Sequence, residues 1–222
     1  MNINMPASLK DRVATARIKA IPKNQIILYE GDRPPQVFIL KRGIVKLYNI
    51  DDQGNEKILH LLKPAALMPL AFFSGDNIPT RWYYTALTNC EVYELPKKVL
   101  EELMEADGKV ATYLVSQFSE DVHEVLVRLD SLSKTNVPSK LTAALWYLVV
   151  CHGVAQGKGW WRIPFSINHQ LLADMMGVSR ESTSLAMKPL LDSKVIRNPR
   201  LAVLEIHEEK LKAYRQKLVT AD

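Results

Sequence analysis

The stretch LLADMMGVSREST, residues 171–183, decides the fold of the C-terminal part of the chain. The apolar residues before Gly177 recur with helical spacing, and Ser179 is a residue type that caps a second helix. Gly177 suits the turn between them because a residue without Cβ adopts positive φ easily. The small Ala173 allows the helices to approach closely. The stretch therefore predicts a helix-turn-helix. The residues expected to pack inward are Leu172, Met176, Val178, Thr183 and Ala186.

The segments before this motif predict a helix and a strand. SKLTAALWYLVVCH (139–152) is typical of a helix, closed by Gly153. WWRIPF (160–165) predicts a short strand at a sheet edge, because Pro164 cannot donate a hydrogen bond to a neighbouring strand. Ser166 is expected to cap the first helix of the motif.

The segments after the motif predict a wing and a closing helix. VIRNPRLAVLEI (195–206) has the pattern of a β-hairpin that turns at Asn198-Pro199. HEEKLKAYRQKL (207–218) follows as a final helix. Together with the motif, these elements predict a winged helix-turn-helix.

Between Ile18 and Pro96, short apolar runs alternate with turn residues. The run VFILKRGIVKLYNI (37–50) is interrupted at Gly43, and DDQGNE (51–56) connects two runs in the manner of a hairpin. This pattern predicts an N-terminal antiparallel β-roll, or jelly-roll. The whole chain is therefore expected to be α+β.

From about Lys97 the apolar period becomes helical, and Gly108 permits a break before a second, long helix. The apolar residues of that helix are spaced alternately by four and three, as in a heptad seam between two helices. The seam could instead pack on the β-roll. We expect it to form a homodimer, because Tyr113, Leu114 and Leu126 lie off the seam and could make the contact with the roll. The seam residues are Ala111, Val115, Phe118, Val122, Val125, Leu129 and Leu132.

The polar segment SKTNVP (133–138) predicts a hinge, since Pro138 disfavours helical geometry at Val137. The expected domains are a sensor-like β-roll (1–107), a dimerisation helix with its hinge (108–137) and a winged helix-turn-helix (138–222).

The excess positive charge lies entirely in the C-terminal part. Residues 136–222 contain twelve Lys and Arg against seven Asp and Glu, whereas residues 1–135 contain seventeen of each. A basic excess confined to the segment with the helix-turn-helix predicts a polyanionic partner for that segment.

Several classes of protein are excluded by composition and motifs. The chain has no apolar run of membrane-spanning length and no signal peptide at its N-terminus, so we expect a cytoplasmic protein that does not insert into membranes. Its two cysteines, Cys90 and Cys151, are too few for a four-cysteine zinc or iron–sulfur site, and no metal site is predicted. Phosphate-binding loops and hydrolase or metalloprotease motifs are absent, so no enzymatic activity is expected.

From Ile18 to Leu211 the chain resembles the CRP/FNR superfamily of bacterial transcription regulators. The resemblance is carried by Glu30-Gly31-Asp32, by the run from Phe38 to Leu47 and by the run from Gly177 to Thr183. It implies a homodimer that binds a pseudo-palindromic site in promoter DNA with one recognition helix per subunit, and RNA polymerase as a further partner.

The resemblance also implies which side chains contact DNA. Ser179, Arg180 and Glu181 would face the major groove, where Arg180 donates to guanine and Glu181 accepts from cytosine N4. Leu185 stands where the best-known members carry another arginine, so it either contacts a thymine methyl group or packs inward. Pro189 predicts a kink or an early end of the recognition helix. Further expected DNA contacts are Ser184, Lys188, His169, Gln170 and Arg200.

The sensor side departs from the family pattern. Met68-Pro69-Leu70 replaces the Gly-Glu-Leu of members that bind cyclic nucleotides, and Arg81 precedes Trp82 instead of a small hydroxyl residue. Cyclic AMP is therefore not expected, although a small effector of another kind would fit a pocket in the β-roll. Two alternatives stay open: a regulator with a degenerate sensor domain and no effector, and a sensor that binds a protein instead of DNA. The candidate pocket residues, which would equally fit ordinary positions in a β-roll, are Arg81, Trp82, Leu70, Phe72 and Tyr83.

Overall fold

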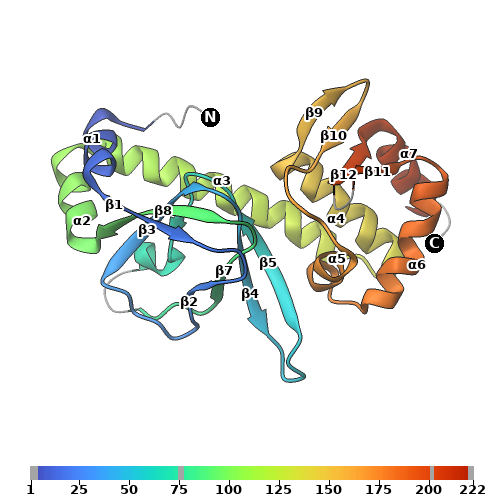
Figure 1. Cartoon of the computed structure of the whole chain (residues 1–222), viewed down its shortest axis with the longest axis horizontal. Coiled ribbons are helices and arrows are strands. Elements are labelled where there is room, and N and C mark those ends of the chain that lie inside the picture. Colours follow the sequence, from blue (N-terminus) through green and yellow to red (C-terminus); the bar gives the residue numbers. More distant parts are fainter. Residues whose placement is uncertain (1–4, 75–77, 201–202, 220–222) are drawn as a thin grey trace. The chain divides into compact units, whose positions relative to one another are not determined.

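A computed structural model describes residues 5–74, 78–200 and 203–219 of the chain. The chain forms two compact units, whose elements are labelled in Figure 1. The first unit contains the chain up to Asn49 and the segment Leu59–His123, and the second contains Ile50–Ile58 and the chain from Glu124 onward.

Two four-stranded sheets form the predicted β-roll, with strand orders β1-β8-β3-β6 and β2-β7-β4-β5. Neighbouring strands pair antiparallel, as between β3 and β8 and between β4 and β7, which confirms the predicted type of sheet. The strands are β1 (Arg17–Ile21), β2 (Ile26–Leu28), β3 (Gln36–Arg42), β4 (Val45–Ile50), β5 (Glu56–Leu62), β6 (Leu67–Met68), β7 (Tyr83–Ala86) and β8 (Cys90–Pro96).

The apolar core of the roll is built from side chains of both sheets. Leu40 of β3 and Val92 of β8 pack in one buried cluster with Leu47 of β4 and Tyr84 of β7. Side chains alternate between the two faces of a strand, so one face of each sheet can supply this core. The other face of β3 supplies Val37 and Ile39 to a second buried cluster. Burial of these apolar side chains is the main stabilising contribution to the roll.

The turn between β3 and β4 depends on a glycine. Gly43 has a φ of +99°, and a Cβ built on it would lie 2.6 Å from Sγ of Cys90 and 2.7 Å from the carbonyl oxygen of Asn89. Both the backbone conformation and the available space therefore favour glycine at this position.

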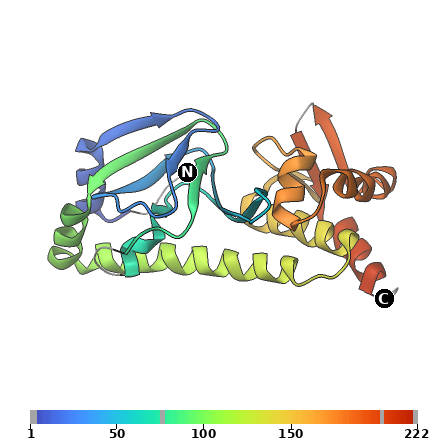
Figure 2. The same ribbon diagram turned by 90° about the horizontal axis from the view of Figure 1, so that it is seen from below.

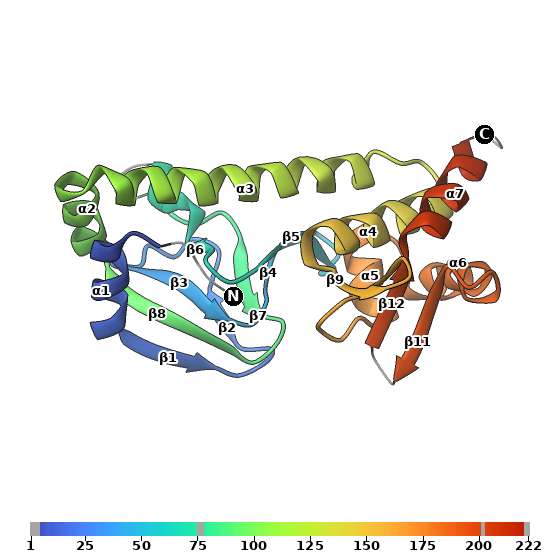
Figure 3. The ribbon, with the colours of Figure 1, turned by 90° about the horizontal axis from the view of Figure 1, so that it is seen from above.

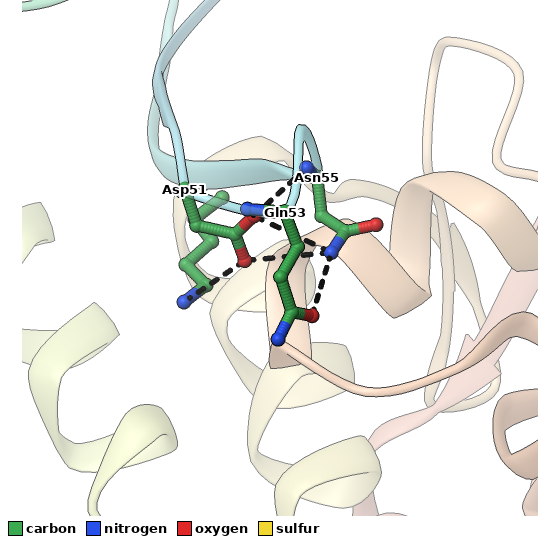
Figure 4. A network of polar contacts seen from close by, with 4 residues as sticks. Asp51, Gln53 and Asn55 are labelled. Atoms are coloured by element: carbon green, nitrogen blue, oxygen red, sulfur yellow. Dashed lines mark hydrogen bonds and ion pairs between the residues drawn. The ribbon is translucent and has the colours of Figure 1, made fainter.

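The predicted DDQGNE hairpin connects β4 to β5. One carboxylate oxygen of Asp51 accepts hydrogen bonds from the backbone N–H groups of Gln53 (3.0 Å) and Asn55 (2.9 Å), as Figure 4 shows. The backbone hydrogen bond from Asn55 makes the largest contribution to holding the pKa of Asp51 below its usual value. Hydrogen bonds from Lys57 and Gln53 lower this pKa further. The aspartate thus closes the turn through local side-chain to backbone bonds.

Three helices belong wholly or partly to the first unit: α1 (Ala7–Thr15), α2 (Lys97–Ala106) and α3 (Gly108–Leu132). Figure 3 shows α1 and α2 side by side at one end of the roll. Leu9 of α1, Leu100 of α2 and Leu114 of α3 join one buried cluster against the sheet. The sequence pattern predicts α2 and α3 but not α1.

Helix α3 runs without interruption, as Figure 2 shows. Leu114 is buried and Tyr113 packs against the same cluster, as expected for off-seam contacts with the roll. The expectation for Leu126 was wrong, because its side chain is 58% exposed. Twelve residues separate it from Leu114, which rotates it about 120° around the helix and away from the buried face.

The second unit packs helices around α4 (Val137–His152). Residues Leu141, Leu145 and Leu148 of α4 are fully buried, and this helix contacts α5, α6 and α7. A four-stranded sheet of order β11-β12-β10-β9 completes the unit. The remaining elements are α5 (His169–Met176), α6 (Arg180–Asp192), α7 (Glu208–Val219), β9 (Val154–Gly157), β10 (Trp160–Arg162), β11 (Ile196–Arg200) and β12 (Val203–His207), in addition to η1 (Leu70–Ser74) of the first unit.

Three boundary predictions need correction. Val137 is helical, because Asn136 caps α4 and Pro138 lies in the first turn, where its missing N–H is not required. Strand β10 is interior, since it pairs with both β12 and β9, and Pro164 lies beyond its end. Asn198 belongs to strand β11 and does not form the turn of the wing hairpin.

Candidate DNA-binding interface

The turn between α5 and α6 has the geometry that the sequence predicts. Gly177 adopts a left-handed conformation with φ of +64°, and the backbone N–H of Val178 donates to the carbonyl of Ala173 at 3.2 Å. Of the residues predicted to pack inward, Leu172 and Met176 are buried, whereas Val178 and Ala186 are partly buried. The small Ala173 is also buried. The two helices therefore form a helix-turn-helix with a tightly packed corner.

Side-chain caps define the start of both helices. The Oδ1 atom of Asn168 accepts from the backbone N–H of Leu171 at 2.7 Å, so Asn168 caps α5 and the prediction of Ser166 was wrong. The Oγ atom of Ser179 accepts from the backbone N–H of Ser182 at 3.1 Å and caps α6. Ser179 thus has a structural role at the end of the helix that carries Arg180.

Helix α6 has one buried and one exposed face. Thr183, Met187 and Leu190 are buried against the unit. The opposite face exposes Arg180, Glu181 and Lys188, with Ser184 partly buried beside them. Leu185 also lies on this face, and its side chain is 64% exposed, which excludes the alternative that it packs inward.

Pro189 does not end the helix, contrary to the expectation of an early end. Helix α6 continues to Asp192, three residues beyond the proline. The pyrrolidine nitrogen cannot donate to the carbonyl of Leu185. The last turn is closed instead by Ser193, whose hydroxyl and backbone N–H both donate to the carbonyl of Pro189.

A cleft of roughly 520 Å³ lies beside the start of α6 and brings together residues from three elements. His169 and Gln170 of α5 line it with Arg180 of α6 and Asn198 of β11. Nε2 of Gln170 donates to Oδ1 of Asp174 at 2.7 Å. Asn198 was not among the predicted site residues, because its approach to Arg180 depends on how the wing folds back.

Two arginines of the wing sheet share one buried glutamate. The Glu205 side chain is 2% exposed, and each of its carboxylate oxygens lies 2.8 Å from a terminal guanidinium nitrogen, one from Arg162 and the other from Arg197. Burial raises the pKa of Glu205, but the hydrogen bonds from the two arginines outweigh it and hold the pKa below its usual value. The guanidinium carbon of Arg197 also lies 3.9 Å from the centre of the Trp160 ring.

This arrangement fixes the strands of the wing and was missed by the sequence analysis. Forty-three residues separate Arg162 from Glu205, so only the strand register brings them together. Arg200, a predicted DNA contact, lies in β11, but its side chain is outside the described part of the structure.

Two parts of the chain match known protein families. Residues 18–107 match the cyclic nucleotide-binding domain family and residues 139–214 match the Crp-like helix-turn-helix domain family. The chain belongs to the CRP/FNR superfamily of transcription regulators.

Named relatives share most of the chain. It is 28% identical over 174 residues to the HTH-type transcriptional regulator ArcR of Staphylococcus epidermidis, covering 78% of this chain and 75% of ArcR. It is 22% identical over 199 residues to a global nitrogen regulator of a Nostoc species, covering 89% and 85% of the two chains.

A solved structure supports the same fold. The cyclic nucleotide-binding domain containing protein from Listeria monocytogenes superposes with a TM-score of 0.76 at 16% identity, covering 91% of this regulator and 99% of that protein. Within the described residues, no helix of the regulator is both long and apolar enough to cross a membrane.

The predicted seam of α3 carries several exposed apolar side chains. Val115, Val122 and Leu129 are exposed, and Phe118 and Leu132 are 38% and 37% exposed, with the Phe118 ring centre 5.1 Å from that of Phe73. Ala111 and Val125 are partly buried. Exposed apolar side chains that follow a heptad pattern mark a surface suited to a second helix.

The candidate effector residues occupy different environments. Leu70 and Trp82 pack against the core of the roll, whereas Phe72 packs against the cluster that includes α1 and α2. Arg81 is exposed, and Tyr83 stacks on Tyr48 with ring centres 5.3 Å apart. Phe72 lines a cleft of roughly 300 Å³ beside Arg33 and Lys97. An effector pocket formed by these residues stays a prediction.

Proposed function

We propose that this regulator is a homodimer that binds a pseudo-palindromic DNA site and controls transcription from it. The observation that carries the proposal is the exposed face of α6, which presents Arg180 and Glu181 at the start of a capped helix. A helix of this kind enters the major groove with its N-terminal residues at the base edges.

The chemistry of the first two residues suits base recognition. Arg180 has a planar guanidinium that can donate two hydrogen bonds to O6 and N7 of guanine. Glu181 is an acceptor that suits N4 of cytosine. Each good pairing contributes about 1–3 kcal/mol of discrimination against the wrong base. Lys188, Ser184, His169, Gln170 and Arg200 are proposed to contact the backbone or neighbouring bases.

The exposed seam of α3 supports the proposed dimerisation. Two copies paired through Val115, Val122 and Leu129 would be related by a two-fold axis, and they would present two copies of α6. The two half-sites should then be about 34 Å apart, which is one turn of DNA. The chain is proposed to act with RNA polymerase as its partner.

An effector, where one exists, is proposed to bind the β-roll and to be different from cyclic AMP. Met68-Pro69-Leu70 offers no carboxylate for a ribose hydroxyl, and Pro69 has no N–H for a phosphate. The effector would shift the equilibrium between poses of the winged units at the 133–136 connection.

The proposal is tested by fluorescence anisotropy with labelled duplex DNA obtained by in vitro selection. We expect the logarithm of the binding constant to fall linearly with the logarithm of the salt concentration, because bound lysines and arginines release counterions. Arg180→Ala should weaken binding to the selected site roughly 5- to 150-fold. Arg12→Ala is the matched control, since Arg12 is an exposed arginine of α1 in the first unit. Equal effects of the two substitutions, or no duplex binding, would contradict the proposal.

A further inference from the structure

Leu185 is the most exposed apolar side chain on the face of α6 that carries Arg180, Glu181, Ser184 and Lys188. It lies on α6 one turn after Glu181, with Ser184 and Lys188 as its neighbours on the same face. Its 64% exposure is the largest among the exposed large apolar side chains of the described residues. Leaving a leucine this exposed forgoes most of the stabilisation that its burial would give.

The surroundings of Leu185 distinguish between explanations for this exposure. The buried face of α6 is already filled by Thr183, Met187 and Leu190, so Leu185 has no place in the core. A protein-docking surface requires a contiguous apolar patch. Leu185 is instead flanked by Glu181, Ser184 and Lys188, and only Pro189, one turn further along α6, is a second exposed apolar neighbour. The apolar patch is therefore too small for a protein-docking surface.

A base edge in the major groove offers one apolar group that matches so small a patch. This is the methyl group at C5 of thymine, and the same position carries a methyl group in 5-methylcytosine. Every other feature of the major-groove edge that distinguishes the bases is a hydrogen-bond donor or acceptor, which leucine cannot pair.

We propose that Leu185 recognises the C5-methyl group of a pyrimidine in each half-site. The inference rests on the proposed DNA binding and names what this part of the helix reads. One helical turn rises about 5.4 Å, whereas successive base pairs are about 3.4 Å apart. The methylated pyrimidine is therefore expected one or two base-pair steps from the pair contacted by Glu181.

Deoxyuridine substitution tests the contact, because it removes the methyl group of thymine and nothing else. Each thymine of a selected half-site is replaced in turn, and affinity is measured by anisotropy. At one position we expect the regulator to lose affinity about fourfold, the effect of one methyl group that is no longer buried. The Leu185→Ala protein should bind the thymine duplex and the deoxyuridine duplex at that position with equal affinity. Leu191→Ala, which alters a partly exposed leucine elsewhere on α6, should keep the fourfold difference.

A second arm identifies the source of the methyl group. The thymine–adenine pair at that position is replaced by a cytosine–guanine pair, with or without a methyl group at C5 of the cytosine. Tighter binding of the methylated cytosine supports the contact, and its affinity relative to thymine shows whether unmodified or methylated DNA is the preferred target.

The outcomes separate this inference from the proposed function. Specific duplex binding that is indifferent to every deoxyuridine substitution overturns the methyl contact and leaves the proposed function standing. Retention of the deoxyuridine effect in Leu185→Ala would overturn it as well. Absence of binding to any selected duplex would overturn the proposed function and this inference with it.

Discussion

The hydroxyl of Ser179 accepts a hydrogen bond from the backbone N–H of Ser182 at 3.1 Å, and this bond begins the helix that carries the proposed base contacts. The first N–H groups of a helix have no partner within the helix, so a side-chain acceptor stabilises its end. The orientation of Arg180 and Glu181 therefore depends on a serine immediately before them.

Replacing this cap should destabilise the second unit. Ser179→Ala is expected to lower the free energy of unfolding by about 1 kcal/mol and to weaken DNA binding. Urea unfolding followed by tryptophan fluorescence measures the first effect, since Trp146, Trp160 and Trp161 all lie in the second unit. Ser182→Ala keeps the backbone N–H and removes only the hydroxyl that accepts from Oγ of Ser179 at 3.0 Å, so it should cost less. Equal losses for the two variants would show that the cap is unimportant.

A charge in the α3 seam should prevent dimerisation. Val122 is 41% exposed, so Val122→Glu is expected to leave the monomer folded while it places a carboxylate in the proposed interface. Sedimentation velocity should then show a monomer, whereas the unmodified chain should sediment as a dimer. Ser116→Glu introduces the same charge on the outward face of the helix and should remain dimeric. A dimeric Val122→Glu protein would rule out this seam.

The buried Glu205 should make the stability of the wing sheet depend on pH. Its pKa is lowered in the folded protein, so its contribution is present above the unfolded-state pKa of about 4.3 and is lost as the pH falls through the lower folded value. Glu205→Gln should cost about 1.5–3 kcal/mol of unfolding free energy at pH 7. The difference from the unmodified chain should shrink as the pH approaches 3.

Urea titrations at a series of pH values measure this difference. Glu209→Gln is the control, because Glu209 is an exposed side chain paired only with Lys212 among the contacts of the described residues. A Glu205→Gln penalty that is the same at pH 7 and pH 3 would contradict the stabilising role of the ionised carboxylate.

A methyl group at Gly43 should destabilise the β-roll. Gly43→Ala combines a positive φ with contacts of 2.6 Å to Sγ of Cys90 and 2.7 Å to the carbonyl oxygen of Asn89. We expect a loss of roughly 2–4 kcal/mol in unfolding free energy. Gly31→Ala has a similar φ of +88° but no atom within 4 Å of its Cβ, so it should show the backbone cost alone. Similar losses for both would mean that the contact with Cys90 is readily relieved.

Much of the fold could be predicted because local patterns agree with the tertiary structure. The short apolar runs separated by turn residues form the strands of the β-roll. Gly177 adopts the left-handed conformation expected of it. The heptad pattern of α3 was visible because its apolar residues recur at alternating spacings of four and three. Most of these residues are exposed on one face of the helix. Such features depend on residues close in sequence, whose spacing determines which way their side chains point.

The errors arose where a residue's effect depends on its surroundings. Asn168 caps α5 although Ser166 is an equally good cap in isolation, and Pro189 is accommodated within a helix that continues to Asp192. Helix α1 was missed because Leu9 and Val13 are its only buried apolar residues, and they are stabilised by packing against distant elements. The Arg162–Glu205–Arg197 cluster could not be predicted, because it requires the register of three strands.

The most direct test of the central claim is selection of duplexes from a random-sequence pool by the purified full chain. The account predicts enrichment of an inverted repeat whose half-sites are about 10 base pairs apart, each containing a G·C pair that Arg180→Ala no longer selects. Recovery of unrelated sequences, or of a single unrepeated site, would contradict it.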